Sequence, residues 1–173
     1  MSAFPPAWRI EPLTRDHDRA AFTCGVEQLD RYLRQQARQD AQNRAAMPFV
    51  LLTADNHIAG YYTLSAATIL VRDVPLEIVK QQKWPRYPEL PAILIGRLAS
   101  ALAFRGMRVG EMLLMDALKQ VWCLTAIAAL AVVVDAKDDS ARQFYLKYDF
   151  LPFPDRPNRL FLPIKTIEQL FRD

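Results

Sequence analysis

The strongest constraint on the fold is the stretch 91–118, where an apolar strand pattern runs through a glycine turn into a helix pattern. Residues 92–104 are almost continuously apolar, which is typical of a central, buried strand. From Val109 to Trp122 the apolar residues recur at helical spacing, with polar residues between them. A buried strand followed by an amphipathic helix is typical of a layered α/β domain.

The rest of the chain continues the alternation of strands and helices. Further strands are expected at 8–13, 47–53, 58–66, 127–134, 150–151 and 159–163. Further helices are expected at 26–43, near 76–82, from a cap at Asp138 or Ser140 to Tyr148, and from Thr166. The order predicts a mixed α/β fold with helices on both faces of a sheet. We see no repeat or linker, so residues 1–173 are expected to form a single domain.

Composition excludes several kinds of protein. The chain is 51% apolar and 24% charged, which is ordinary for a globular domain, and no apolar run is long enough to cross a bilayer. Two prolines, Pro5 and Pro6, stand where a signal peptide would have its apolar stretch. We therefore expect a cytoplasmic protein that does not associate with membranes.

Cysteine and histidine are too scarce for several chemistries. Cys24 and Cys123 match no metal or redox spacing, and we interpret both as small buried hydrophobic residues. His17 and His57 each lack a neighbouring cysteine or second histidine. A zinc site or a Ser-His-Asp triad is therefore not expected, and we predict no metal.

The turn between strand and helix is a candidate anion site. Helix N-termini carry unpaired N–H groups and partial positive charge, Gly106 and Gly110 allow close approach of the backbone, and Arg105 and Arg108 add formal charge. The pattern alone favours a plain connecting loop, because such turns are common connectors.

Two basic segments are candidate nucleic-acid contacts. Arg31, Arg34 and Arg38 would share one face of a helix, with Asp40 as the one acid between residues 31 and 47. A second segment combines basic residues with aromatic ones: Lys80, Lys83, Trp84, Arg86 and Tyr87. The alternative, favoured by composition alone, is a solvated helix face and a loop with packed aromatic residues.

The sequence resembles the GNAT-type N-acetyltransferases at this turn. Their acetyl-coenzyme A motif, Arg/Gln-x-x-Gly-x-Gly/Ala, is matched by Arg105-Gly106-Met107-Arg108-Val109-Gly110 at its first and last positions. Arg108 replaces the middle glycine. If that position has a positive φ, arginine adds strain there.

Within this group the chain is most similar to the acetyltransferase toxins of bacterial toxin–antitoxin pairs. The matching segments are co-linear over most of the chain: 22–25, 29–30, 32–33, 60–65, 85–88, 96–99, 134–137, 144–145, 153–154 and 159–163. Departures are Pro48 for a usual Thr, Ala101 for a frequent Asp, and Asp149 for the Gly that usually ends the fourth helix. Asp tolerates a left-handed C-cap better than most residues.

The resemblance implies a mostly antiparallel sheet, split between its fourth and fifth strands, that binds acetyl-coenzyme A. The implied cofactor contacts are the 105–110 motif, the backbone of Leu98, Ala99 and Ser100, and Phe144. Tyr145 would be the general acid, because a phenol of pKa about 10 can protonate a departing thiolate. On periodicity alone, Tyr145 is simply an aromatic on the inner face of a helix.

The resemblance further implies that the substrate is the α-amino group of an aminoacyl-tRNA, whose acetylation stops translation. An α-amine, with a pKa of about 7.7–8.0, needs no dedicated base, and none stands out. The basic segments then become candidate tRNA contacts. The implied partners are a ribbon-helix-helix antitoxin, operator DNA through it, and a second copy in a homodimer. Two alternatives stay open: a GNAT enzyme acting on a small amine or protein N-terminus, and a binding module whose cofactor site Arg108 has impaired.

Overall fold

The computed structural model describes residues 5, 7–124 and 126–172. Within these residues seven strands form one sheet in the order β1-β2-β3-β4-β5-β7-β6. The strands are β1 (Arg9–Pro12), β2 (Met47–Leu52), β3 (Ile58–Leu70), β4 (Glu89–Ser100), β5 (Ala131–Asp135), β6 (Leu151–Phe153) and β7 (Arg156–Pro163). Four neighbouring pairs are antiparallel: β1–β2, β2–β3, β5–β7 and β6–β7.

The β4–β5 pair is parallel, and its register runs only from Ala92 to Ile95 in β4. The last five residues of β4, 96–100, lie beyond that register. The expected split between the fourth and fifth strands is therefore present, and the mixed α/β class is confirmed.

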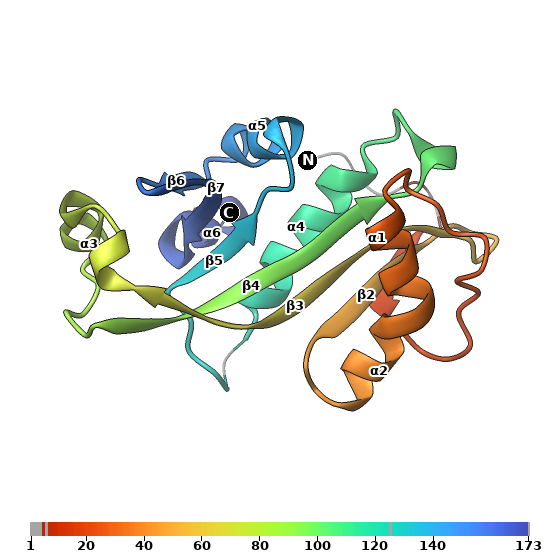
Figure 1. Ribbon diagram of the computed structural model, residues 1–173, viewed down its shortest axis with the longest axis horizontal. Helices are drawn as coiled ribbons and strands as arrows, with labels where there is room; N and C mark the ends of the chain where they lie inside the picture. Colours follow the sequence, from red (N-terminus) through yellow and green to blue (C-terminus); the bar gives the residue numbers. More distant parts are fainter. Residues whose placement is uncertain (1–4, 6, 125, 173) are drawn as a thin grey trace. The chain divides into compact units, whose positions relative to one another are not determined.

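The helices alternate with these strands (Figure 1). The α-helices are α1 (Glu27–Arg31), α2 (Ala37–Gln42), α3 (Leu76–Gln82), α4 (Val109–Trp122), α5 (Asp139–Lys147) and α6 (Ile164–Phe171). Shorter turns are the π-helix η1 (Tyr32–Gln36) and the 3₁₀ helices η2 (Val71–Asp73) and η3 (Leu102–Phe104). None of the helices in the described part of the chain is long and apolar enough to cross a membrane.

The described residues group into two compact units, each built from two separate chain segments. The first unit lies within 1–65 and 96–117, and the second within 66–95 and 118–173. The strands β3 and β4 and the helix α4 run through both. The single domain expected from the sequence stays a prediction.

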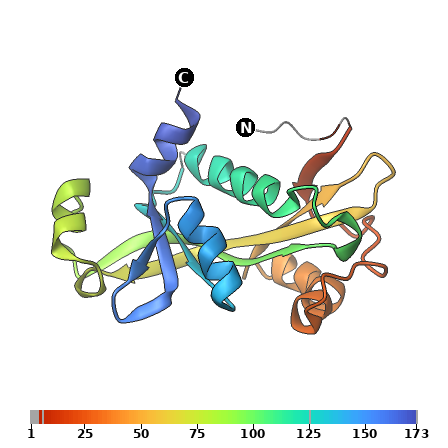
Figure 2. The same cartoon turned by 90° about the horizontal axis from the view of Figure 1, so that it is seen from above.

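In the first unit, helices cover both faces of the strands. Figure 2 shows α4 on one side of β2 and β3, and the α1–α2 segment on the other. The core on the α1–α2 side joins η1, β2, β3 and the end of β4, with Leu33, Val50 and Leu52 fully buried. Gly60 of β3 lies at the closest approach to α4: a Cβ added there would meet Leu113 Cδ1 at 2.8 Å and Val109 Cγ1 at 2.9 Å.

In the second unit, α3, α5 and α6 pack around β5, β6 and β7. Its core includes Val79 of α3, the buried Trp84, and Val133 of β5. The Trp84 ring lies 6.0 Å from that of Phe161, centroid to centroid. The short helix and the following loop expected between residues 70 and 91 are confirmed as α3 and residues 83–88.

Two local sequence signals are confirmed around α5. Asp138 is the N-cap, because its Oδ1 accepts the Ala141 N–H at 2.8 Å. At the other end Asp149 has φ +69°, the left-handed conformation that usually calls for glycine. The Phe150 N–H donates to the Tyr145 carbonyl at 3.2 Å, which completes a Schellman-type end.

Other expectations need correction. The helix expected at 26–43 is interrupted by the π-helix η1, and the strand expected from Ile127 begins only at Ala131. Ile127 is 67% exposed, so an apolar run alone did not mark the strand. The two cysteines are not core residues: Cys24 is half-buried and Cys123 exposed. Apolar composition says that a segment can be buried, but only packing partners decide which residues are.

A buried carboxylate fixes the loop before α1. The Asp30 carboxylate accepts the Cys24 N–H at 2.8 Å and the Thr23 hydroxyl at 3.1 Å. Burial raises the pKa of Asp30, but these hydrogen bonds and the charge of Arg34 outweigh burial, so its pKa lies below the ordinary value. The hydrogen bonds of Asp30 thus give the matching segments around residues 22–25 and 29–33 a structural role.

We expect Asp30→Asn to lower the free energy of unfolding by about 1–2 kcal/mol at neutral pH, because it replaces a charged acceptor. A lowered folded pKa contributes stability that is fully present above the unfolded pKa, about 3.9, and is lost as pH falls through the folded pKa. The difference between wild type and variant should therefore be constant at neutral pH and shrink in acid. Urea titrations across pH measure it, with Asp55→Asn as the exposed control. A difference that grows in acid would refute this role of Asp30.

Candidate active site

The loop from β4 to α4 is open and exposed. It runs through η3 and residues 105–108, all four of which are exposed. Gly106 has φ +83°, and a Cβ built on it would meet no heavy atom within 4 Å. The Met107 N–H donates to the Phe104 carbonyl at 3.3 Å, which holds the turn against η3. The backbone at Gly106 is therefore accessible to a ligand.

The N-terminus of α4 follows directly and supplies the charge for an anion. The first N–H groups of a helix lack intrahelical partners, and the helix dipole adds partial positive charge. Val109 is buried and anchors this end, while Arg105 and Arg108 stand exposed beside it. Backbone donors, two guanidinium groups and an unobstructed glycine fit a pyrophosphate.

Arg108, the departure from the glycine motif, lies outward. Its φ is +58°, so the position does require the left-handed conformation, and arginine is strained there by about 1–2 kcal/mol. Its side chain is 70% exposed, with Nη1 3.9 Å from Glu111 Oε2. The guanidinium therefore does not fill the 105–108 loop, and its positive charge lies at the exposed side of that loop.

We expect Arg108→Gly to retain acetyl-coenzyme A binding, with a dissociation constant raised at most about fivefold. The change relieves strain and removes one exposed charge, which contributes about 0.2–1 kcal/mol. Isothermal titration calorimetry measures the affinity, with Arg105→Ala as a matched loss of charge. A tenfold gain in affinity for the glycine variant would show instead that Arg108 obstructs the site.

The end of β4 leads into this loop. Ala99 is buried, and its carbonyl oxygen would lie 2.8 Å from a Cβ at Gly60. The Ala101 N–H donates to the Ala59 carbonyl at 2.8 Å, which ties this edge to β3. Leu98 and Ser100 are half-buried. The backbone of 98–100 extends past the β5 register, as the expected contacts with a pantetheine arm require.

In the second unit, Tyr145 lies on α5 in an aromatic cluster. Its ring centroid is 5.2 Å from that of Phe144 and 5.3 Å from that of Phe150. Tyr145 is 7% exposed, and no described residue forms a hydrogen bond with its hydroxyl. Burial raises the pKa of Tyr145 above the ordinary value. The phenol therefore stays protonated at neutral pH and keeps its proton available for a leaving group.

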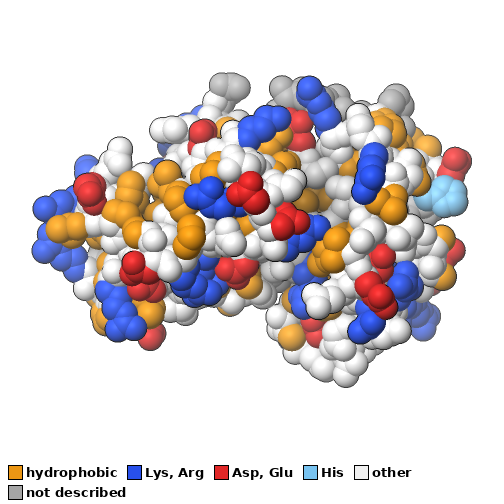
Figure 3. All heavy atoms as spheres, turned by 45° about the horizontal axis from the view of Figure 1, so that its top comes forward, with side chains coloured by type: hydrophobic (Ala, Val, Ile, Leu, Met, Phe, Trp, Pro, Cys, Tyr) orange, Lys and Arg blue, Asp and Glu red, His pale blue; other side chains and the backbone are white. Residues whose placement is uncertain are grey.

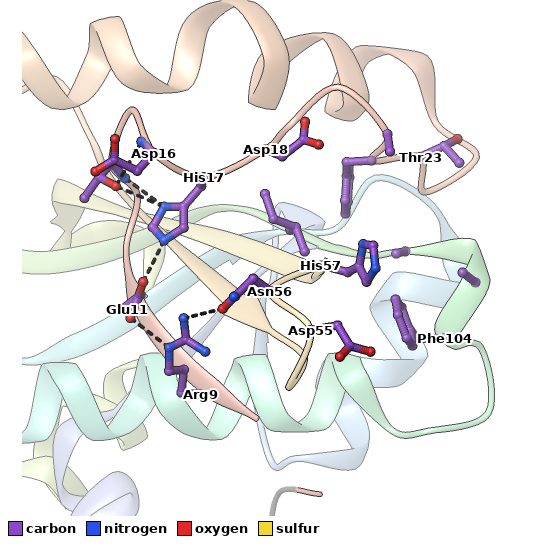
Figure 4. A pocket seen from close by; sticks show the side chains of 16 residues that line it. Arg9, Glu11, Asp16, His17, Asp18, Thr23, Asp55, Asn56, His57 and Phe104 are labelled. Carbon is purple, nitrogen blue, oxygen red and sulfur yellow. Dashed lines mark hydrogen bonds and ion pairs between the residues drawn. The ribbon is translucent and has the colours of Figure 1, made fainter. Parts of the chain in front are cut away.

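The large cavity of the first unit is a different place. It has a volume of about 800 Å³ and is lined by residues of β1, the 14–23 loop, the 55–58 turn and η3. Figure 4 shows Glu11 pointing toward His17 and Arg9 toward Asn56; these contacts measure 2.7 Å and 2.6 Å. Both histidines of the chain line it, together with four carboxylates: Glu11, Asp16, Asp18 and Asp55. Such acidic walls disfavour a polyanion, so this cavity fits the cofactor less well than the 105–110 loop does.

The expected arginine face on the first helix is altered by η1. A π-helix has a wider turn, so spacings of three and four no longer place residues on one face. Arg31 Nη2 pairs with Glu27 Oε1 at 2.8 Å, and Arg34 Nη1 donates to the Phe22 carbonyl at 2.9 Å. Arg38 is half-buried. Contact of these residues with tRNA stays a prediction, although the regular helix on which its spacing relied is interrupted by η1.

In the second basic segment the charged side chains are exposed, but one of the two aromatic side chains is buried. Lys80, Lys83 and Arg86 are exposed, and Tyr87 is 66% exposed. Trp84 is a core residue at 6% exposure, so it is not available to stack on a base. On the face shown in Figure 3, Lys and Arg side chains are interspersed with acidic ones.

Comparison with known proteins decides the family. The chain is 31% identical over 171 residues to the probable toxin TacT of Sinorhizobium fredii, covering 93% of each chain. It is also 31% identical over 157 residues to a tRNA-acetylating toxin of Mycobacterium tuberculosis, covering 90% of this chain and 92% of that one. The chain belongs to the tRNA-acetylating toxins. No protein-family model matches it.

Solved structures of this toxin family agree. AtaT complexed with acetyl-methionyl-tRNAfMet is 31% identical, with a TM-score of 0.86 over 95% of this chain and 99% of that one. A tyrosine-to-phenylalanine mutant of KacT is 30% identical, with a TM-score of 0.87 over 95% and 99%. A corresponding mutant of AtaT, bound to acetyl-CoA and the C-terminus of the antitoxin AtaR, is 27% identical, with a TM-score of 0.80 over 96% and 99%. The GNAT-type fold, the N-acetyltransferase class and acetyl-coenzyme A as donor are thereby confirmed.

Proposed function

We propose that this protein transfers the acetyl group of acetyl-coenzyme A to the α-amino group of an aminoacyl-tRNA. The observation that carries the proposal is co-linear similarity, over at least 90% of both chains, to a tRNA-acetylating toxin and to AtaT with an acetylated tRNA. The open anion-binding loop supports it, because Arg108 lies outward. The outward position of Arg108 also argues against the alternative of a module that has lost its cofactor.

In this proposal the first unit holds the donor. The loop 105–110 binds the pyrophosphate through backbone N–H groups, Arg105 and Arg108, and residues 98–100 bind the pantetheine arm through their backbone. Phe144 is a further proposed contact of the donor, as the family resemblance implies. The donor supplies the acyl group as a thioester, and these contacts orient it.

Tyr145 then acts as the general acid. The neutral α-amine forms the new C–N bond, the C–S bond breaks, and Tyr145 donates its phenolic proton to the departing thiolate sulfur. The amine gives up its own proton to water. A dedicated base is not needed, because an amine of pKa about 7.7–8.0 is substantially neutral near pH 7.5.

The partners follow from the same comparison. We propose a cognate antitoxin of the ribbon-helix-helix class whose C-terminal segment binds this protein, as the C-terminus of AtaR binds AtaT. Operator DNA would be bound through that antitoxin, since an AtaT–AtaR complex binds DNA. We further propose a cytoplasmic location, because the proposed substrate is a tRNA, and a homodimer, because the family resemblance implies one.

Labelled acetyl-coenzyme A tests the substrate class. The protein should label charged tRNA and leave deacylated tRNA, polyamines and peptide N-termini unlabelled. Label on polyamines or peptides, with none in the RNA fraction, would replace this proposal by the alternative of a small-amine or protein-directed enzyme.

A further inference from the structure

Arg97 of β4 has an unusual environment in the first unit. It stands one residue before the 98–100 segment and is half-buried. Its guanidinium carbon lies 3.5 Å from the centroid of the Tyr32 ring, a close cation–π contact. Stacking on a ring covers one face of the guanidinium and leaves its N–H edges free to donate.

The ring beneath Arg97 is held from several sides. The Tyr32 hydroxyl donates to Asp40 Oδ2 at 2.7 Å, and Gln36 Nε2 donates to Asp40 Oδ1 at 2.9 Å. Tyr32 also stacks on Tyr61 at a centroid distance of 6.3 Å. Tyr32 is 6% exposed. A buried, hydrogen-bonded ring fixes the orientation of the group stacked on it.

The donors of Arg97 have no partner among the described residues. No carboxylate lies within 4.0 Å of its guanidinium, and no acceptor receives a hydrogen bond from it. Two other half-buried arginines are engaged: Arg142 Nε donates to the Pro157 carbonyl at 2.8 Å, and Arg159 Nη1 contacts both oxygens of Asp135 at 3.0 and 3.1 Å. The half-buried Arg38, like Arg97, forms no such bond among the described residues. A hydrogen bond from Gln36 and, to a lesser extent, the charge of Arg97 lower the pKa of Asp40. The N–H groups of Arg97 lie open to solvent, where a ligand can accept hydrogen bonds from them.

The sheet face indicates which ligand this is. Side chains alternate along a strand, so Arg97 shares its face with Ala99 and Ala101, in the core beside Tyr32. The helix α4, whose N-terminus opens the cofactor loop, covers the opposite face (Figure 2). Arg97 is therefore on the wrong side to bind the pyrophosphate, and on the side left for the acceptor.

We propose that Arg97, held on Tyr32, binds a phosphate in the 3′-terminal single strand of the aminoacyl-tRNA; this rests on the proposed function. The planar fork of a guanidinium matches two phosphate oxygens, and a charge-assisted bond of this kind fixes position as well as affinity. The role of Arg97 is substrate binding. The π-helical turn that presents Tyr32 serves it, as π-turns at functional sites often do.

The test compares Arg97→Gln and Arg97→Lys with the exposed control Arg72→Gln. Acetylation of charged tRNA is measured at several salt concentrations, and acetyl-coenzyme A affinity by calorimetry. Arg97→Gln should raise the KM for charged tRNA about tenfold or more and reduce the salt slope of log kcat/KM by about 0.7, the value for one single-strand phosphate. Arg97→Lys should keep the wild-type salt slope of log kcat/KM, and its KM for charged tRNA should lie between those of the wild type and Arg97→Gln. Arg72→Gln and all coenzyme affinities should stay unchanged.

The outcomes separate this inference from the proposed function. If the wild type acetylates tRNA while Arg97→Gln retains its KM and salt slope, the inference is wrong and the function stands. A change in coenzyme affinity with an unchanged slope would assign Arg97 to the donor and also overturn it. A wild type that acetylates no tRNA would overturn both. If Arg97→Gln does not fold, the lysine variant decides: a salt slope below that of the wild type would count against the inference.

Discussion

Replacing Tyr145 by phenylalanine should lower kcat for acetyl transfer by about 10²–10⁴-fold, the usual contribution of a general acid. The change removes only the phenolic proton and keeps the ring that packs against Phe144 and Phe150. The hydroxyl forms no hydrogen bond with a described residue, so the melting temperature should stay nearly constant. Acetyl-coenzyme A affinity should be unchanged as well. Single-turnover acetylation of charged tRNA measures the effect.

The matched control is Tyr148→Phe, on the same helix and also against Phe144. This variant should retain activity, because the proposed mechanism takes no proton from Tyr148. Burial raises the pKa of Tyr145, so the phenol stays a proton donor throughout the neutral range. The wild-type rate should therefore rise with pH only as the α-amine loses its proton, and should show no second step near neutrality. A fully active Tyr145→Phe protein would remove Tyr145 from the mechanism.

Replacing Gly60 by alanine should destabilise the first unit by about 2–3 kcal/mol, although alanine is normally preferred to glycine inside a strand. The added Cβ would stand 2.8 Å from the Ala99 carbonyl oxygen, and backbone cannot move as cheaply as a flexible side chain. It would also press on Val109, the first residue of α4. At about 2–4 °C per kcal/mol, the melting temperature should fall by about 5–10 °C.

The same change should weaken acetyl-coenzyme A binding, because it separates the end of β4 from the N-terminus of α4. Thr68→Ala, at an exposed position of the same strand, is the control and should alter neither property. Thermal unfolding and calorimetry on the purified variants measure both. A Gly60→Ala protein as stable as the wild type would show that β3 and α4 are not packed as described.

Sequence patterns predicted the elements whose signals are local. The cap at Asp138, the left-handed end at Asp149 and the helix α3 between prolines all depend on a few neighbouring residues. Helical periodicity likewise found α4 with its bounds. The same strand–turn–helix pattern located the 105–108 loop, whereas its proposed role in binding the cofactor came from the family resemblance.

Features set by distant contacts could not be predicted. The sequence predicted that Trp84 stacks on a base, but its side chain lies in the core of the second unit. The π-turn arises where Tyr32 and Gln36 both reach Asp40, which no helical period reveals. The sequence indicated no role for Arg97 beyond its place in the matching segment 96–99. Its partner ring stands 65 residues earlier in the chain, and only the fold brings the two together.

Mass spectrometry of the tRNA 3′ end shows whether this protein acetylates an aminoacyl-tRNA. Charged tRNA is incubated with the protein and acetyl-coenzyme A, digested with nuclease, and the released aminoacyl-adenosine is weighed and fragmented. We expect the aminoacyl-adenosine to gain one acetyl group on its α-nitrogen, and we expect no such gain when Tyr145→Phe replaces the wild type. An aminoacyl-adenosine of unchanged mass, from a protein that demonstrably binds acetyl-coenzyme A, would contradict it.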